Sequence, residues 1–288
     1  MDYVVCIPSY KRSLLLKEKT LSTLLKHKIS PDKIYIYVAN KDEYDEYDNV
    51  LDKGTYNKLI VGKKGLVPQR QFIMEQWGEN KHIVFFDDDL KTIDLSMSGK
   101  DKTLDGFIKR AFYECVEHKS YIWGVYPVFN PFFRKGRPDI TTCLNYIVGA
   151  FYGIINRPKL KSLRLTLTAE NGQKEDVERT IKYFIEDGIV LRFNKIGFET
   201  KYYGKEGGLG TFEDRLKPML EASKKLKEKY PEYGDIVTRP SGMTEFRLKR
   251  IPSRMVEETE KTEKTEKTKT TQKNKSKKNK TIKKVKTK

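Results

Sequence analysis

The chain has 288 residues, of which 37% are hydrophobic, and it carries a formal net charge of +18 at pH 7. This length permits a sizeable core and suits one globular domain with at most a small annex. No apolar run approaches the roughly 18 residues of a membrane span, and no basic segment with an apolar run behind it opens the sequence. We therefore expect an intracellular, soluble protein, cytoplasmic or nuclear, and not a secreted one.

Charge is distributed unevenly along the chain. Residues 257–288 contain 13 lysines and 5 glutamates, a net charge of +8, which leaves +10 on the remainder. The tail repeats Glu-Lys-Thr and cannot bury enough apolar area to offset its ordering entropy, so we predict a domain at 1–252 and a disordered basic tail at 253–288. The basic body indicates a polyanionic partner, such as nucleic acid, nucleotide phosphates or a membrane surface, with simple solubility as the alternative.

Strands and helices are expected to alternate about every 20 residues in the first half. Strands are predicted at 3–7, 33–38, 59–61 and 82–86, with helices at 14–27 and 69–77. This alternation predicts a parallel α/β sheet. The second half is expected to contain helices at 103–118, 175–187 and 212–230, strands at 121–125, 190–193 and 245–249, an apolar β-rich stretch at 144–155 and a glycine-rich loop at 202–210.

The scattered cysteines Cys6, Cys115 and Cys143 have no metal-ligand spacing and indicate a reducing compartment. Ligands of parallel sheets bind at the carboxyl ends of the strands. Four segments of the first half follow predicted strands and should converge at that edge: residues 8–12, 39–40, 62–65 and 87–89.

The triplet Asp87, Asp88 and Asp89 follows the apolar strand at 82–86. Adjacent carboxylates repel one another, and a divalent cation such as Mn²⁺ or Mg²⁺ would neutralise them with oxygen ligands. The alternative is an acidic helix N-terminus ahead of Leu90. The triplet alone would also suit a phosphatase or a nuclease.

The order of three motifs resembles the nucleotide-binding half of the GT-A glycosyltransferases over residues 1–95. These motifs are Ile7-Pro8-Ser9-Tyr10-Lys11-Arg12, the segment from Gly65 to Gln69-Arg70, and the Asp triplet. The resemblance implies a Rossmann-like α/β fold with a mostly parallel central sheet flanked by helices. It also implies that Asp89 and Asp87 hold the metal, and that the nucleotide sugar is bound by Pro8, Ser9, Tyr10, Arg12, Asn40, Gly65, Arg70, Asp87, Asp88 and Lys205.

The acceptor half, 96–252, has a second acidic element. Glu175-Asp176 opens a helix with Arg179 one turn later, which is similar to the element that supplies the catalytic base in inverting members of the family. Asp176 is the first candidate for that base and Glu175 the second; the alternative is that both are ordinary partners of the helix dipole. Lys205 lies on the glycine-rich loop and could close over a diphosphate, or belong to a simple turn.

A narrower resemblance rests on Gly65-Leu66-Val67-Pro68-Gln69-Arg70-Gln71, on residues 202–208 and on Arg215. These segments are similar to the TET-associated and base J-type DNA glycosyltransferases of phages, viruses and protists. That family would imply transfer of glucose from UDP-glucose to a hydroxymethylpyrimidine in DNA, with a viral factory or virion as a further location. The alternatives are a protein or glycan acceptor, and a non-enzymatic nucleic-acid-binding protein on a degenerate transferase fold.

A DNA acceptor agrees with the loop Phe132-Phe133-Arg134-Lys135-Gly136-Arg137, which interleaves aromatic and basic residues. Such a surface can stack on bases and bind phosphates. The alternative for this loop is a buried Phe pair with solvated charges. The basic tail could likewise act as a non-specific tether or a nuclear-localisation patch.

Overall fold

The computed structural model describes residues 2–200 and 210–254. The chain divides into two units, Met1–Ile251 and Pro252–Lys288, and the helices and strands given below belong to the first. The glycine-rich loop at 202–209 and almost the whole of the predicted tail lie outside the described residues. Within the described part of the chain, no helix is both long enough and apolar enough to cross a bilayer.

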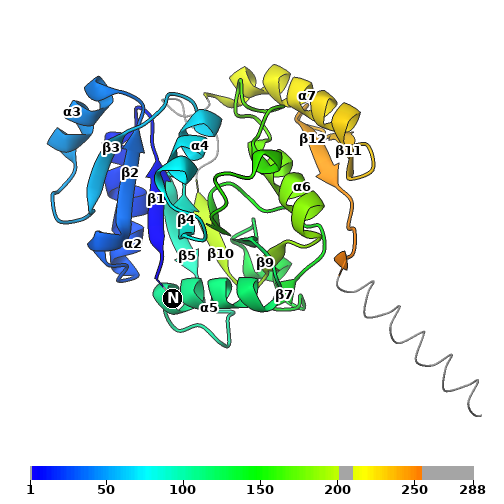
Figure 1. Ribbon diagram of the computed structural model, residues 1–288, viewed down its shortest axis with the longest axis horizontal. Coiled ribbons are helices and arrows are strands. Elements are labelled where there is room, and N and C mark those ends of the chain that lie inside the picture. The colour runs from blue at the N-terminus through cyan, green and yellow to red at the C-terminus, as the bar shows by residue number, and fades with distance from the viewer. Residues whose placement is uncertain (1, 201–209, 255–288) are drawn as a thin grey trace, which may run out of the picture. The chain divides into compact units, whose positions relative to one another are not determined.

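A mixed sheet forms the centre of the first unit (Figure 1). Its strands are β1 (Val4–Pro8), β2 (Ile34–Val38), β3 (Lys58–Val61), β4 (His82–Phe86), β6 (Ile122–Val125), β7 (Ile140–Thr141), β8 (Phe151–Ile155) and β9 (Leu191–Phe193), in the order β3-β2-β1-β4-β8-β6-β9-β7. The four N-terminal strands pair in parallel. Strand β8 runs antiparallel to both β4 and β6, and β7 runs antiparallel to β9. The predicted mostly parallel α/β sheet is therefore confirmed, with antiparallel strands in its second half.

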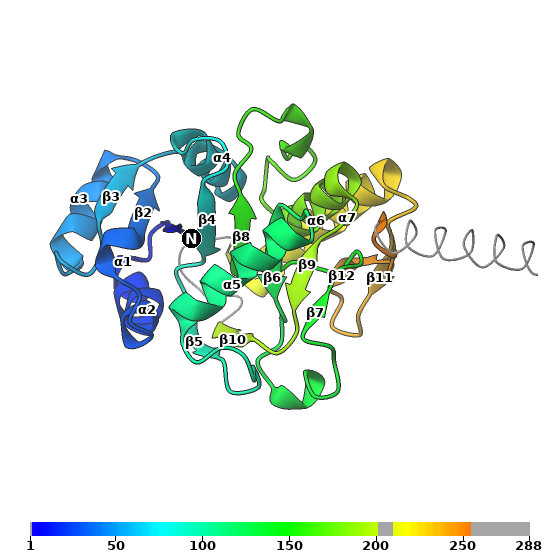
Figure 2. The same cartoon turned by 60° about the horizontal axis from the view of Figure 1, so that its bottom comes forward.

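Helices cover both faces of this sheet. They are α1 (Ser13–Leu16), α2 (Ser22–Lys26), α3 (Lys41–Val50), α4 (Leu66–Gln76), α5 (Leu104–Glu117), α6 (Glu175–Asp187) and α7 (Phe212–Lys229), with short 3-10 turns at Pro31–Lys33, Pro131–Phe133 and Lys161–Leu163. Figure 2 shows α5 lying across the middle strands of the sheet. The predicted helices are all present, and α3 was not predicted because its sequence is polar and only Glu43 and Tyr47 are buried.

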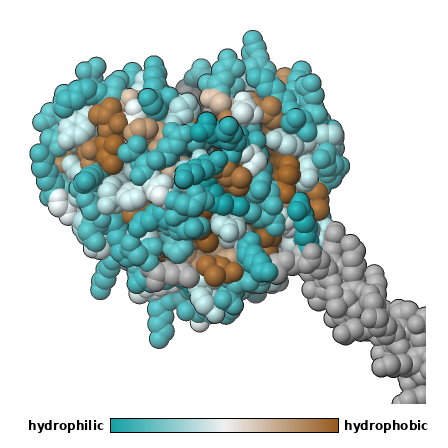
Figure 3. Space-filling model, viewed as in Figure 1, coloured by the Kyte–Doolittle hydropathy of each residue, from teal (hydrophilic) through white to brown (hydrophobic). Residues whose placement is uncertain are grey.

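Alternating side chains along β1 and β4 build one hydrophobic layer on each face. Val5 and Phe86 belong to the cluster that α1, α2 and α5 cover, whereas Cys6 and Phe85 belong to the cluster that α4 and α6 cover. Strands buried on both faces read as continuous apolar runs, which explains the sequence Ile-Val-Phe-Phe ahead of the Asp triplet. On the face seen in Figure 3, hydrophilic residues predominate and hydrophobic residues occur in small separate groups.

Helices α1 and α2 are joined by a π-helical turn, Lys17–Leu21, within the helix predicted at 14–27. The turn contains Thr20, which is fully buried beside the end of β4. Its Oγ1 donates to the carbonyl oxygen of Asp87 at 2.6 Å and accepts from the amide of Leu90 at 2.9 Å. Single π turns are common at functional sites, and this one fixes the backbone of the Asp triplet.

The segment after the triplet is a strand and not a helix. Strand β5 (Leu90–Asp94) pairs antiparallel with β10 (Gly197–Thr200), and the register places Thr200 opposite Leu90. The alternative of a helix beginning at Leu90 is therefore wrong. A second hairpin joins β11 (Gly234–Thr238) to β12 (Thr244–Leu248).

The β-rich stretch predicted at 144–155 forms a strand only from Phe151 onward. The backbone before Phe151 is irregular, and side chains replace a neighbouring strand as hydrogen-bond partners of its amide and carbonyl groups. The amide of Gly149 donates to Asp176, and its carbonyl oxygen accepts from Arg70. This loop therefore belongs to the functional site.

Candidate active site

A cavity of about 310 Å³ opens at the carboxyl ends of β1, β2 and β4. We call it the nucleotide cavity; its lining is Pro8, Ser9, Tyr10, Arg12, Ala39, Lys63, Lys64, Gly65, Leu66, Gln69, Asp87, Asp88, Asp89, Thr200 and Arg215. All four segments that were expected to converge at this edge contribute to it. Four cations face three carboxylates here, and a small-molecule site of this size is ordinary for proteins.

Asp88 is the buried member of the triplet. Its side chain is 8% exposed and accepts hydrogen bonds from Ser9 Oγ at 2.6 Å and from Arg12 Nη1 at 3.2 Å. Tyr47 supports this arrangement, because its hydroxyl lies 2.7 Å from Ser9 Oγ and accepts from the amide of Arg12. Burial raises the pKa of Asp88 to about 6, although Arg12 opposes the shift. The role of Asp88 is to orient the loop at 8–12.

Asp89 faces the segment contributed by β10. Thr200 Oγ1 donates to Asp89 Oδ1, and Arg12 Nη1 lies 3.3 Å from Oδ2. Thr200 was not predicted from the sequence, since only the β5–β10 pairing brings it within reach of the triplet. Arg12 thus bridges Asp88 and Asp89 and offsets part of their mutual repulsion.

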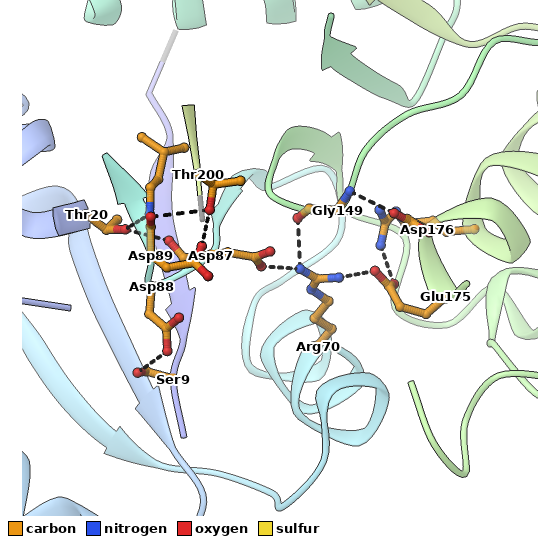
Figure 4. A network of polar contacts seen from close by, with 12 residues as sticks. Ser9, Thr20, Arg70, Asp87, Asp88, Asp89, Gly149, Glu175, Asp176 and Thr200 are labelled. Carbon is orange, nitrogen blue, oxygen red and sulfur yellow. Dashed lines mark hydrogen bonds and ion pairs between the residues drawn. The ribbon is translucent and has the colours of Figure 1, made fainter. Parts of the chain in front are cut away.

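Asp87 belongs to a buried ionic network that extends away from the cavity (Figure 4). Arg70 Nη2 donates to Asp87 Oδ1 at 2.7 Å, and Arg70 Nη1 pairs with Glu175. Glu175 also pairs with Arg179, so both of its oxygens are engaged. Arg70 and Glu175 are 4% and 3% exposed, and a buried carboxylate held between two guanidinium groups is a fixed structural anion.

Asp176 lies beside this network on the first turn of α6. Its Oδ2 accepts from the hydroxyl of Tyr146 and, at 3.3 Å, from the amide of Gly149. Unlike Glu175 it forms no ion pair with the described residues, and it is only partly buried. Of the two carboxylates, Asp176 is therefore the one that a hydroxyl group could approach, since Glu175 is buried between two arginines.

The other predicted residues are placed differently. Pro8, Ser9, Tyr10, Arg12, Gly65, Asp87, Asp88 and Asp89 line the nucleotide cavity. Asn40 caps α3 by accepting from the amide of Glu43 at 2.9 Å, and Arg70 reaches the cavity only through Asp87. Lys205 lies outside the described residues. Lys63 and Lys64 lie in the segment 62–65 that was expected at this edge, but they were not singled out as binding residues.

No protein-family model matches the chain, and neither does any curated protein. Among solved structures, it is similar to the mannosyltransferase PcManGT from Pyrobaculum calidifontis in complex with GDP-Man and Mn²⁺. The two are 12% identical, the match covers 83% of this chain and 66% of that chain, and the TM-score is 0.50. The chain has the GT-A fold. The fold predicted from the sequence is thereby confirmed.

Two further structures share the GT-A resemblance at lower scores. Residues 1–349 of S. aureus TarS in complex with UDP are 16% identical, with 79% of this chain and 66% of that chain covered and a TM-score of 0.45. Glucosyl-3-phosphoglycerate synthase from Mycobacterium tuberculosis, in complex with Mn²⁺, UDP and glucosyl-3-phosphoglycerate, is 10% identical, with 88% and 91% covered and a TM-score of 0.49. The chain spans slightly less than two thirds of the TarS and PcManGT chains.

The donor set of this GT-A site fits a hard divalent cation. Asp87 Oδ2 has no partner among the described residues, and the Asp87 side chain is 36% exposed toward the cavity. No group of three acidic, His or Cys side chains in the described ranges could hold a metal alone. Mg²⁺ usually binds one or two protein carboxylates together with substrate phosphates and water. Two aspartates and a diphosphate would complete such a set.

The loop predicted to contact DNA exposes its two Phe side chains, contrary to the alternative of a buried Phe pair, while Lys135 and Arg137 are exposed as that alternative expected. Phe132 and Phe133 are 76% and 50% exposed, whereas Arg134 is fully buried. Arg134 pairs with Asp94 and donates to the carbonyl oxygens of Lys195 and Phe129, both at 2.8 Å. Arg134 therefore anchors the loop to the β5–β10 pair, and the exposed aromatic rings remain as its candidate contact surface.

Proposed function

We propose that the chain is a metal-dependent glycosyltransferase that moves a sugar from a nucleoside diphosphate to an acceptor hydroxyl. The observation that supports this most directly is the nucleotide cavity, where three aspartates at the end of β4 face four cations. The GT-A fold agrees with the proposal. The fold alone does not carry an activity, so the proposal rests on the site.

Different residues of the nucleotide cavity would bind different parts of the sugar donor. Tyr10 provides an aromatic face for the base, with Lys11 Nζ and Lys64 Nζ at 5.5 and 6.0 Å from its ring. Lys63 and Lys64 supply positive charge for the diphosphate. Asp89 and Asp87 would hold Mn²⁺ or Mg²⁺, which supplies neutralisation of the charge that develops on the leaving nucleotide.

Proton transfer is assigned to Asp176. The attacking hydroxyl gives its proton to Asp176 as its oxygen bonds to the anomeric carbon, and the bond from that carbon to the diphosphate breaks. The hydrogen bonds from Tyr146 and Gly149 orient the carboxylate. Glu175 holds Arg70 and Arg179 in place and does not take part in the proton transfer.

The acceptor is proposed to be DNA that contains a hydroxymethylpyrimidine, with UDP-glucose as the donor, as in the TET-associated and base J-type enzymes. The net charge of +10 outside the tail and the exposed Phe132 and Phe133 support a nucleic-acid acceptor. The target base would have to leave the duplex stack before its hydroxymethyl group reached the anomeric carbon.

A transfer assay tests both the glycosyltransferase activity and the DNA acceptor. Labelled UDP-glucose, Mn²⁺ and hydroxymethylated DNA should yield labelled DNA, and Asp89→Ala should lower the rate by at least about a hundredfold, in the range for loss of an electrostatic catalytic group. Asp42→Ala, an exposed aspartate on α3, is the matched control and should leave the rate unchanged. Hydrolysis of the sugar donor without labelling of DNA would contradict the DNA acceptor alone. Salt-sensitive DNA binding with no turnover of any nucleotide sugar would contradict the enzyme.

A further inference from the structure

A second cavity, of about 620 Å³, lies in the acceptor half and shares no lining residue with the nucleotide cavity. We call it the basic cavity because five cationic side chains line it. They are Lys174, Arg192, Arg239, Arg247 and Arg250. These residues come from the turn before α6, from β9 and from the β11–β12 hairpin with its C-terminal flank, so the fold gathers them from distant parts of the sequence.

The charges in this cavity are not balanced. Glu245 is the one carboxylate in its described lining, and it pairs with Arg239 at 2.8 Å. Arg192, Lys174, Arg247 and Arg250 form no ion pair with any described residue. Five cations around one cavity with a single lining carboxylate, and Asp176 near Lys174, leave an excess of positive charge, which favours an anionic ligand.

Arg192 gives the strongest indication of an anionic ligand, because this cation is only 9% exposed. Its Nε donates to Asn194 Oδ1 at 3.0 Å, and its guanidinium lies 5.2 Å from the ring of Tyr126. Burial, together with the nearby Arg137 and Arg250, lowers the pKa of Arg192 to about 10. A buried cation without a carboxylate is costly to maintain, and a bound anion would offset that cost.

Lys174 adds a second feature that is unusual for a structural residue. Its backbone is left-handed, with φ of 60°, immediately before α6. A residue other than glycine in this conformation is strained by roughly 1 kcal/mol or more, and such strain clusters at ligand sites. The conformation brings the Lys174 side chain to the cavity wall.

The remaining lining is apolar and suits a ring. Leu144, Val148, Val177 and Phe246 provide carbon surface between the cations. A free inorganic anion would leave this surface uncovered, whereas a phosphate attached to a sugar or a base would cover it. The chemistry of the cavity is therefore that of an organic phosphate.

Tyr146 connects the basic cavity to the catalytic carboxylate. It lines the cavity, and its hydroxyl donates to Asp176. A ligand held by Arg192 and Lys174 would therefore lie against the wall that carries the proposed base. Such a ligand would be one hydrogen-bonded side chain away from Asp176.

We propose that the basic cavity binds a phosphate-bearing ring compound, either a nucleotide unit of a nucleic acid or a free sugar phosphate, and that this compound is part of the acceptor. Binding itself does not depend on the proposed function; only the acceptor assignment rests on it. Arg192 and Lys174 act as binding residues, and Arg250 supplies charge at the mouth of the cavity.

Binding can be measured without any nucleotide sugar. Full-length protein would be titrated in a calorimeter with inorganic phosphate, with glucose 6-phosphate and with a single-stranded oligonucleotide that contains hydroxymethylcytosine. We expect one organic probe to bind more tightly than inorganic phosphate, and the better probe identifies the source of the phosphate. The expected loss on Arg192→Gln or Arg250→Gln is at least about tenfold in Kd, as for one charge-assisted hydrogen bond.

The matched control is Arg164→Gln, which removes the same charge from an exposed site outside both cavities. An equal loss of affinity in Arg164→Gln would show that only the net charge of the protein matters, and would overturn the proposal. The proposal would also be overturned if none of the three probes bound. Arg192→Gln should also raise the melting temperature of the free protein, because it removes an unpaired buried charge. Arg250 is exposed, so Arg250→Gln keeps the test valid if Arg192→Gln does not fold.

Transfer assays separate this inference from the proposed function. If the protein binds the probe in the basic cavity but transfers no sugar, the proposed function is contradicted and the proposed ligand of the basic cavity still stands. Transfer that Arg250→Gln leaves unchanged in both KM and kcat would contradict the acceptor role. A raised KM for the acceptor with unchanged kcat is the expected result.

Discussion

Arg70 offers the sharpest test of the site's architecture, because one guanidinium joins three partners. It binds Asp87 at 2.7 Å, the carbonyl oxygen of Gly149 at 2.8 Å and the buried carboxylate of Glu175. Arg70→Met keeps the aliphatic volume and removes all three bonds. Glu175 keeps its pair with Arg179, but one of its carboxylate oxygens and the carbonyl oxygen of Gly149 lose their donor. We therefore expect a loss of at least about 2 kcal/mol in the free energy of unfolding, since each stranded buried acceptor costs about 1–3 kcal/mol.

The measurement is urea unfolding of the full-length protein, followed by circular dichroism. Arg164→Met is the matched control, because Arg164 pairs with Glu75 at 3.3 Å while their side chains are 53% and 45% exposed. An exposed pair of this kind contributes at most about 1 kcal/mol. Equal losses in the two variants would refute the idea that the buried network holds the site together. A double-mutant cycle with Glu175→Gln would locate the loss in this pair if the two single losses add up to more than the loss of the double variant.

Two further predictions concern charged groups away from the nucleotide cavity. Asp105 binds Tyr3 and Lys109; burial alone would raise its pKa, but hydrogen bonds from Lys109, Tyr3 and Lys33 outweigh burial and lower it to about 2. Asp105→Asn should therefore cost about 1 kcal/mol at pH 7, and the difference from the native chain should shrink as the pH falls below about 4 and be largely lost near pH 2, where the folded carboxylate is half protonated; a difference in the free energy of unfolding that is as large at pH 2 as at pH 7 would contradict this. Glu178 is fully buried and accepts from three backbone amides, at 166–168, and from one hydroxyl. Glu178→Ala should cost about 3 kcal/mol or more, because each stranded donor costs at least about 1 kcal/mol; a loss below that of Arg164→Met in the same urea assay would show that water replaces the carboxylate.

The sequence predicted those elements whose pattern is strong and local. The strand at 82–86 and the helix at 175–187 have the predicted bounds, because an apolar run before charged residues and an acidic helix start are both local signals. The loops of the nucleotide cavity were also predictable, since the carboxyl ends of parallel strands meet at one edge of a sheet.

Features that depend on distant pairing were not predictable. Thr200 reaches Asp89 only because β10 pairs with β5 more than 100 residues earlier in the chain. Arg134 is a second feature that the sequence could not predict, this time within a single loop. In the sequence it is one of three basic residues in a loop, and only the position of Asp94 shows that it is buried while its neighbours are not.

Hydrogen bonds link Asp87, Arg70, Gly149, Asp176 and Tyr146 in series, from a residue of the nucleotide cavity to a residue of the basic cavity. Figure 4 shows the part from Asp87 to Asp176. A donor and a metal that drew Asp87 toward them, as proposed above, would change the forces on Arg70, whose guanidinium also binds the carbonyl oxygen of Gly149. Thermodynamic linkage then requires reciprocity: any factor by which the nucleotide changes the affinity of the basic cavity must equal the factor by which the second ligand changes the affinity for the nucleotide. A coupling measured from one cavity therefore fixes the coupling measured from the other, in size and in sign.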